Sequence, residues 1–373
     1  MAGIYIHVPF CKTKCIYCDF FTRTSMNQKN PYVEAISKEI VLRKDYLGNE
    51  TIDTIYFGGG TPSQLDREDL KSILDAVKKQ FIINPDAEIT LEANPDDLTE
   101  SYIGMLLDLG FNRLSMGVQS FDNNMLHFLN RRHSAEKAID AVKTSQQIGF
   151  TNISIDLMYG LPNQTMQVWD DTLNQAVDLG IQHISSYHLI YEKGTRLYRL
   201  LNIGEVKAID EDLSLAMFSK MIDRLTEVGF IHYEISSFGK EGCFSRHNTS
   251  YWQNVEYLGL GPAAHSYNRI NRCWNVSSIP KYIEAIEKQH PLIEEEELDL
   301  KTQYNDFVLT RMRTMWGVSV EELCGIDFYD YFAKNIQKHI DSDLVVYDGQ
   351  TFRLDKNGIF VSDSIMSDLM YLD

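Results

Sequence analysis

Residues 3–18 read GIYIHVPFCKTKCIYC, a short alternating strand followed at once by three cysteines. Cys11, Cys15 and Cys18 stand on one loop with the spacing C-x3-C-x2-C. Three thiolates on a short loop can hold three irons of a 4Fe-4S cubane and leave the fourth iron open to an exchangeable ligand. Structural zinc is the main alternative, but it needs four ligands, and no second Cys/His pair stands at a suitable spacing. We therefore predict a 4Fe-4S site, with His7 packed or hydrogen-bonded in the strand.

Outward from this strand, short β-rich runs alternate with amphipathic helical runs. We expect strands at residues 3–8, 51–57, 88–92, 113–118, 152–157 and 183–189, and helices near 67–79, 100–109, 135–147 and 167–179. This alternation predicts an α/β fold with a parallel sheet. Six β/α units form either an open sheet or a partial barrel, and in both the chemistry gathers at the C-terminal ends of the strands. The cysteine loop and a glycine-rich loop at 58–62 lie at those ends.

A helix between the first two strands has the clearest signals. Asn30 can cap it, and Pro31 suits its first turn. Its expected apolar stripe comprises Val33, Ile36, Ile40 and Val41. After the sixth strand we expect a helix at 211–228 and a strand at 230–235.

The last quarter of the chain has a different pattern. An acidic run at 294–297 is expected to be a solvated linker or domain edge. Helical runs near 304–315, 320–323 and 329–339 then precede a hairpin, 344–347 and 351–354, turning at Asp348-Gly349. This predicts a small winged-helix-like domain. We therefore divide the chain into a partial barrel core (1–235), an extension (236–297) and a C-terminal α+β domain (298–373).

Composition restricts the classes of partner. The 373 residues carry a formal charge of -18, and affinity for nucleic acid comes chiefly from Lys and Arg, so no broad nucleic-acid surface is expected. No apolar run approaches about 18 residues and no leader precedes the first strand, so we expect a soluble, cytoplasmic protein. Cys243, Cys273 and Cys324 are scattered singly, and we expect them to be small buried residues.

The cysteine spacing, with Tyr17 just before the third cysteine, resembles the signature of the radical SAM superfamily. In that superfamily the open iron chelates the amino and carboxylate groups of S-adenosylmethionine (SAM), and an electron from the cluster cleaves SAM to a 5'-deoxyadenosyl radical. The resemblance implies a partial barrel of six β/α units. It also implies that the glycine-rich loop, through Gly60 and Thr61, receives the SAM amino group.

Four further polar residues stand at or just past strand ends: Glu92, Gln119, Arg131 and Asp156. An acid can bond the ribose hydroxyls or amino group of SAM, and an arginine can pair with its carboxylate. Their contexts, TLEANP (90–95), RLSMGVQSF (113–121), NR (130–131) and IDLMYGLP (155–162), resemble in order the SAM site of the oxygen-independent coproporphyrinogen III oxidase family. The resemblance covers essentially the whole chain. It implies that Tyr5, Tyr17, Gly60 and Thr61 join these four residues in holding SAM.

Three features are similar to the HemW-type branch, regarded as haem chaperones, rather than to the oxidases. Oxidases have a fourth cysteine where this chain has Phe20, and they carry an N-terminal arm before the first strand, where this chain has only two residues. The run HNTSYW at 247–252 also matches the H-N-x-x-Y-W motif that HemW-type proteins associate with haem.

The resemblance implies haem-binding roles for His247, Asn248, Tyr251 and Trp252. A neutral imidazole can ligate haem iron, and aromatic rings can cover a porphyrin face. Without the resemblance, Tyr251 and Trp252 would be core aromatics and His247 a loop histidine. Whether His247 touches iron or supports a pocket stays open at this point, and His265 is a second candidate.

The resemblance thus implies a haem chaperone with a 4Fe-4S cluster, SAM and haem as cargo. Its partners would be a haem-acceptor protein, with respiratory proteins among the candidates, and an electron donor. Membrane contact would come only through a partner. Enzymatic activity is left open. The alternatives are a coproporphyrinogen III oxidase using a 5'-deoxyadenosyl radical and a radical SAM enzyme that modifies RNA, which the charge disfavours.

Overall fold

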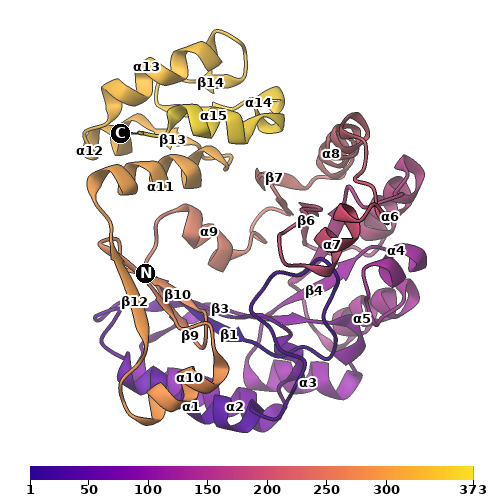
Figure 1. Cartoon of the computed structure of the whole chain (residues 1–373), viewed down its shortest axis with the longest axis vertical. Helices are drawn as coiled ribbons and strands as arrows, with labels where there is room; N and C mark the ends of the chain where they lie inside the picture. Colours follow the sequence, from indigo (N-terminus) through magenta and orange to yellow (C-terminus); the bar gives the residue numbers. More distant parts are fainter. Residues whose placement is uncertain (373) are drawn as a thin grey trace.

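The computed structural model describes residues 1–372, so Asp373, the last residue of the expected C-terminal domain, lies outside the described residues. Six parallel strands lie side by side in chain order at the centre of a twelve-stranded sheet (Figure 1). They are β1 (Ala2–Val8), β2 (Ile52–Gly59), β3 (Ile83–Ala93), β4 (Arg113–Gln119), β5 (Ile153–Tyr159) and β6 (His183–His188). This confirms the predicted α/β fold, a partial barrel of six β/α units.

Helices cover the outer face of this sheet (Figure 1). They are α1 (Lys29–Leu42), α2 (Arg67–Gln80), α3 (Glu100–Leu109), α5 (Ala135–Ile148), α6 (Met166–Asp178) and α8 (Glu211–Glu227). Strand β1 shows why the layers form: Ile4 and Ile6 are fully buried in one apolar cluster with Ile36 of α1. Each such side chain contributes about 1.5–3 kcal/mol on burial. The alternate residues of β1 face inward, where Tyr5 lies against Tyr56.

The start of α1 differs from the prediction. The helix begins at Lys29, whose N–H donates to the Met26 carbonyl at 3.0 Å, so Asn30 lies inside the helix and is not its cap. Pro31 is therefore the third helical residue, where a missing N–H still costs no hydrogen bond. Val41 is 49 % exposed and lies off the apolar stripe. Helix α1 is thus held by burial rather than by capping.

The sheet continues beyond the six parallel strands on both sides. Next to β6 lie β8 (Ser237–Gly239) and β7 (Ile231–Glu234), and next to β1 lie β9 (Tyr257–Leu260), β10 (His265–Tyr267), β11 (Asn271–Asn275) and β12 (Ile293–Glu297). Of the two alternatives for residues 294–297, a solvated linker or a domain edge, the linker is wrong: the run belongs to the outermost strand β12, which pairs antiparallel with β11. Its glutamates are exposed along the edge of the sheet. Charge on an edge strand opposes pairing with another chain.

Four helices of the main body and two short 3₁₀ turns were not predicted. They are η1 (Pro62–Gln64), η2 (Pro95–Asp97), α4 (Asn123–Phe128), α7 (Arg196–Asn202), α9 (Arg246–Trp252) and α10 (Ile279–Glu287). Helix α9 lies between the partial barrel and the C-terminal helices (Figure 1).

The C-terminal part has its own apolar core. It contains α11 (Leu300–Met312), β13 (Val318–Ser319), α12 (Val320–Gly325), α13 (Tyr329–Ile340), β14 (Val345–Tyr347), β15 (Thr351–Leu354), α14 (Lys356–Phe360) and α15 (Ser362–Leu369). The predicted hairpin is confirmed as β14 and β15. Of the three single cysteines only Cys273 is buried; Cys324 is exposed and Cys243 half-buried, so that expectation was wrong for two of them. Across residues 1–372, no helix is both long and apolar enough to cross a membrane.

Candidate cluster and cofactor site

Cys11, Cys15 and Cys18 line one cavity of about 510 Å³ at the C-terminal ends of the parallel strands. The cysteine loop follows β1 directly, and the Cys11 N–H donates to the Arg23 carbonyl at 3.0 Å, which closes the loop on itself. A cavity of this size matches the range of roughly 300–1,000 Å³ found for small-molecule sites. The strand order thus brings the three thiols to the edge of the sheet where a cofactor would bind.

Two side chains from other strand ends reach the cysteine sulfurs. The Thr61 hydroxyl donates to Cys11 Sγ at 3.3 Å, and Arg131 Nη1 donates to Cys15 Sγ at 3.4 Å. Burial raises the pKa of the Cys11 thiol and raises that of Cys18 to about 11. Because thiolates are the iron ligands, binding a cluster here would release protons.

The glycine-rich loop after β2 approaches the cysteine segment closely. The Gly60 N–H donates to the Val8 carbonyl at 2.8 Å, and a Cβ on Gly60 would lie 2.7 Å from that oxygen. Gly59 has a φ of +103°, and a Cβ there would lie 2.5 Å from the His7 ring. Side chains at these two positions would push the loop away from β1. The glycines therefore let the backbone form one wall of the cavity.

Two half-buried carboxyl groups, Glu92 and Asp156, face the same cavity. Glu92 accepts hydrogen bonds from the Tyr56 hydroxyl at 2.8 Å and from the Gly59 N–H at 3.1 Å. Burial raises the pKa of Glu92 to about 7 and that of Asp156 to about 6. Both groups are therefore poised to ionise when a cationic ligand enters.

Arg131 and Gln119 line the same cavity. Arg131 Nη2 donates to the Asn94 side chain and to the Gly117 carbonyl, while its buried Nε has no hydrogen-bond partner among residues 1–372. Gln119 has a φ of +69°, an uncommon backbone conformation that often marks a ligand site. Two carboxyl groups and an arginine around one cavity fit the amino group, ribose hydroxyls and carboxylate of SAM.

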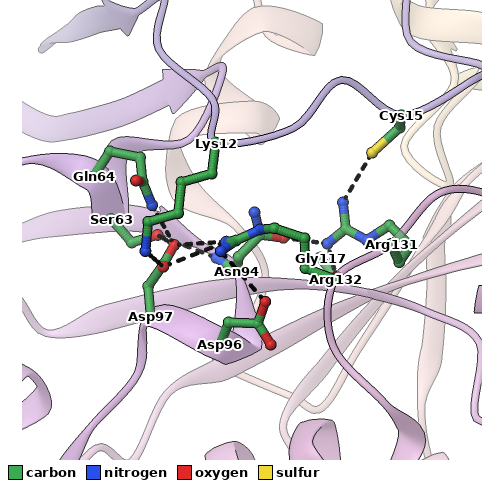
Figure 2. Close-up of polar contacts among 10 residues, drawn as sticks. All are labelled: Lys12, Cys15, Ser63, Gln64, Asn94, Asp96, Asp97, Gly117, Arg131 and Arg132. Carbon is green, nitrogen blue, oxygen red and sulfur yellow. Dashed lines mark hydrogen bonds and ion pairs between the residues drawn. The ribbon is translucent and has the colours of Figure 1, made fainter. Parts of the chain in front are cut away.

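Asp97 joins the cysteine loop to two other loops, as Figure 2 shows. Its carboxylate accepts hydrogen bonds from Lys12 at 2.9 Å, from Ser63 at 2.9 Å and from Gln64 at 2.6 Å, and it pairs with Arg132 at 3.3 Å. The Asp97 side chain is only 4 % exposed. One carboxylate thus connects the residue next to Cys11 with the loop after β2 and the loop before α5.

Most residues predicted for SAM line this single cavity. They are Tyr17, Gly60, Thr61, Glu92, Gln119, Arg131 and Asp156, together with the three cysteines. Tyr5 is not among the lining residues. Its hydroxyl bonds His7 Nδ1 at 3.1 Å and its ring stacks with Tyr56 beneath the cavity. His7 Nε2 also bonds the Phe21 carbonyl at 3.0 Å, so His7 is hydrogen-bonded as expected.

His247 lies inside the barrel, beneath the cavity. It is 1 % exposed, its Nδ1 bonds the Thr54 hydroxyl at 2.7 Å and its Nε2 bonds the Tyr251 hydroxyl at 2.7 Å. Its ring stacks on Tyr56 with centroids 5.0 Å apart, and Tyr56 in turn bonds Glu92. In this conformation neither ring nitrogen is free for iron. Helix α9 therefore closes the floor of the barrel.

The other members of the predicted haem motif are spread over different surroundings. The Arg313 guanidinium lies 4.1 Å from the Trp252 ring centroid, so this tryptophan contacts the C-terminal domain. Tyr251 packs edge-on against Tyr257, with centroids 4.6 Å apart. The Asn248 N–H donates to Ser245, the N-cap of α9. The structure does not bring these side chains to one open pocket with His247. His265, the second candidate, is exposed near Trp274.

Sequence reasoning missed several other residues that hold the cysteine loop or line the cavity. Asp97 and Arg132 follow predicted strand ends, but nothing in their spacing shows that they meet Lys12. The lining residues Tyr187 and His188 end β6, a position that could have marked them.

Comparison with known proteins agrees with this architecture. Residues 5–176 match the model of the radical SAM superfamily, and residues 298–361 match the HemN C-terminal domain. The chain is 35 % identical over 322 residues to "Heme chaperone HemW" of Bacillus subtilis, covering 86 % of this chain and 85 % of the relative. It is 32 % identical over 373 residues to "Heme chaperone HemW" of Mycobacterium tuberculosis, covering 99 % of this chain and 94 % of the relative.

A solved structure extends the likeness to the whole fold. Coproporphyrinogen III oxidase (HemN) from Escherichia coli superposes with a TM-score of 0.86 at 23 % identity, covering 99 % of this chain and 90 % of that one. This supports the fold alone. With relatives 32 % and 35 % identical along most of its length, the chain belongs to the HemW family of the radical SAM superfamily.

Proposed function

We propose that this protein is a haem chaperone that carries a SAM-liganded 4Fe-4S cluster, binds haem and delivers it to an acceptor protein. The observation that carries this proposal is the end-to-end similarity to curated relatives named as haem chaperones. The site supports it: three thiols and most of the residues predicted for SAM line one cavity, while Phe20 stands where an oxidase would have its next cysteine.

Within this proposal each part of the cavity has a task. Cys11, Cys15 and Cys18 would hold three irons, and the bound cluster would supply an open iron for SAM and a single electron. Glu92 and Asp156, ionised, would attract the cationic amino group, and Arg131 would pair with the carboxylate. The buried cavity walls would exclude water from these groups. A chaperone needs none of the later radical chemistry, so SAM binding here is proposed as structural or regulatory.

The acceptor, the electron donor and the cytoplasmic location stay predictions. A haem-acceptor protein, with respiratory proteins among the candidates, is the partner proposed. The net charge of -18 speaks against RNA as a substrate.

One anaerobic experiment tests the proposal against its oxidase alternative. The cluster is reconstituted, haem is titrated in, and an apo-acceptor protein is then added. In parallel the protein receives coproporphyrinogen III, SAM and a reductant. Stoichiometric haem binding, transfer to the acceptor and no vinyl product support the chaperone. Turnover to protoporphyrinogen, or no haem binding, would overturn it.

A further inference from the structure

Tyr56 of β2 is a buried tyrosine beneath the cavity, only 6 % exposed. Its ring stacks with Tyr5, with centroids 6.2 Å apart, and with His247, with centroids 5.0 Å apart. A Cβ on Gly58 would lie 2.9 Å from the Tyr56 ring, so the glycine leaves room for that ring. A side chain packed against two other rings stays in one rotamer, which fixes the direction of its hydroxyl.

The Tyr56 hydroxyl points at the carboxylate of Glu92, which lines the cavity near the end of β3. It donates to Glu92 Oε1 at 2.8 Å, and the Gly59 N–H donates to Oε2 at 3.1 Å. Both oxygens thus have a fixed donor, and because a carboxylate oxygen accepts more than one hydrogen bond, each keeps a site for a ligand. A backbone N–H can only donate. These partners therefore suit the ionised carboxylate better than the protonated acid.

The groups around Glu92 act on its charge in opposite directions. Burial raises the pKa of Glu92 most, and the neighbouring Asp156 of β5 raises it further. The hydrogen bond from Tyr56 lowers that pKa most, followed by the Gly59 N–H and by Arg113 of β4. Other titratable side chains around this pair stay neutral, because burial raises the pKa of the phenols and lowers that of the imidazole: Tyr5, Tyr187, Tyr251 and His247.

We propose that Tyr56 is a positioning residue of the SAM site, whose hydroxyl keeps the Glu92 carboxylate charged and turned so that both oxygens can accept hydrogen bonds from SAM. This inference rests on the proposed binding of SAM and deepens it. Tyr56 itself is not among the residues that line the cavity, so it acts on SAM only through Glu92.

The variant Tyr56→Phe tests this role, because it keeps the ring and its stacking and removes only the hydroxyl. Equilibrium binding of SAM to the reconstituted holoprotein is measured from pH 6 to 9, on parent and variant side by side at equal iron content. Titration of SAM itself cancels in the ratio of the two affinities. Without the donor the charged carboxylate is less stable, so the pKa of Glu92 should rise by about one unit. The parent should then bind SAM about tenfold more tightly than the variant at pH 6 and about equally at pH 9.

Tyr282→Phe is the matched control. Tyr282 is 2 % exposed and its hydroxyl donates to the buried Glu39 Oε2 at 2.6 Å, but neither residue lines the cavity. This variant loses the same kind of hydrogen bond, so its free energy of unfolding should fall, while its SAM affinity should equal that of the parent at every pH. A double variant isolates the coupling: in the Glu92→Gln background, Tyr56→Phe should no longer change the pH dependence.

Two results would overturn the inference. One is a Tyr56→Phe affinity equal to the parent's across the whole pH range. The other is an affinity lowered by the same factor at pH 6 and pH 9, because Tyr56 would then support the barrel wall without controlling the charge of Glu92. Both results leave the SAM site in place, since the parent still binds. A parent protein that bound no SAM would instead sink the proposed site, and the inference with it.

Discussion

Asp97 ties the cysteine loop to the barrel although it touches no cysteine. Its carboxylate accepts hydrogen bonds from Lys12, Ser63 and Gln64 and forms an ion pair with Arg132. Residues of three loops therefore meet at this one side chain (Figure 2). Cluster binding requires three thiols held close together on a loop that has no regular structure of its own. The position of Cys11 therefore depends on a residue from the end of another strand.

Replacing Asp97 by Asn should loosen this loop. The variant removes the charge that pairs with Lys12 and Arg132 and leaves a buried amide among donors, which costs about 1–3 kcal/mol. We expect a lower free energy of unfolding and less iron retained after reconstitution. Asp108→Asn, at an exposed ion pair with Arg67, is the matched control. Iron content and unfolding equal to the parent would show that Asp97 does not position the loop.

Glu92 should make SAM binding depend on pH. Its pKa of about 7 in the free site means that it is protonated below neutrality and charged above. Because the charged form attracts the SAM amino group, SAM affinity should rise as pH increases from about 6 to 8. Asp156, with a pKa of about 6, adds to the rise at the acidic end.

Equilibrium binding of SAM at several pH values measures this effect. Glu92→Gln should bind SAM more weakly at pH 8 and should flatten the pH dependence between 7 and 8. A parent protein whose affinity stays constant from pH 6 to 8 would rule out the assigned role of Glu92.

At the scale of elements, α9 closes the barrel floor through His247. The ring bonds Thr54 and Tyr251, stacks on Tyr56, and its backbone N–H donates to Glu88 at 3.0 Å. The Tyr56 hydroxyl also donates a hydrogen bond to Glu92, which lines the cavity. Helix α9 therefore supports the cavity from below through His247 and Tyr56.

His247→Ala should therefore destabilise the protein by about 2–4 kcal/mol, because it leaves a void and two buried hydroxyls without partners. SAM affinity should fall with it. Tyr251→Phe keeps the ring and loses one hydrogen bond, so its cost should be about 1 kcal/mol. Chemical unfolding and SAM titration check both. Loss of haem binding in His247→Ala with unchanged stability and SAM affinity would instead identify His247 as a haem ligand.

The strands and helices show which parts of the fold could be predicted from the sequence alone. Alternation of strand and helix patterns predicted β1 to β6 and the longer helices between them, but not the short α4, because each predicted element buries a continuous apolar face that periodicity reveals. The run at 294–297 was misread because four glutamates indicate solvent, and an edge strand and a linker are equally solvated. Only the pairing with β11, whose residues stand 18 to 26 positions earlier, separates an edge strand from a linker.

The residues in and below the cavity likewise fall into those whose position could be predicted from the sequence and those whose position could not. That the three cysteines and most of the residues assigned to SAM line one cavity could be predicted, since strand order brings residues at the C-terminal strand ends together. The position of His247 inside the barrel could not be predicted. Its hydrogen bonds with Thr54 and Glu88 join residues 193 and 159 positions apart along the chain, and no local pattern indicates them.

At the scale of the whole molecule, one arginine joins the C-terminal domain to the barrel. Arg313 pairs with Glu234 at 3.2 Å, stacks over Trp252, and its carbonyl accepts the Ile235 N–H at 3.1 Å. The backbone continues this contact, because the Met315 N–H donates to the Tyr233 carbonyl at 2.9 Å. The two cores should consequently unfold as one unit.

Arg313→Ala should weaken that coupling. Loss of the ion pair and the stacking leaves Glu234 buried without its partner, at a cost of about 1–3 kcal/mol. Calorimetry should then show a broader or split transition, with Arg353→Ala, at an exposed pair with Asp348, as the control. A single transition at the parent temperature would show that the domains are held together by other contacts.

The claim at the centre of this account is a 4Fe-4S cluster on Cys11, Cys15 and Cys18 whose open iron accepts SAM. Electron paramagnetic resonance of the reduced, reconstituted protein tests it most directly, recorded with and without SAM, on the parent and on Cys15→Ala. The account predicts about four irons per chain and a cluster signal that SAM shifts, and no such signal in the variant. A variant that retains the iron and the signal, or a parent signal indifferent to SAM, would contradict it.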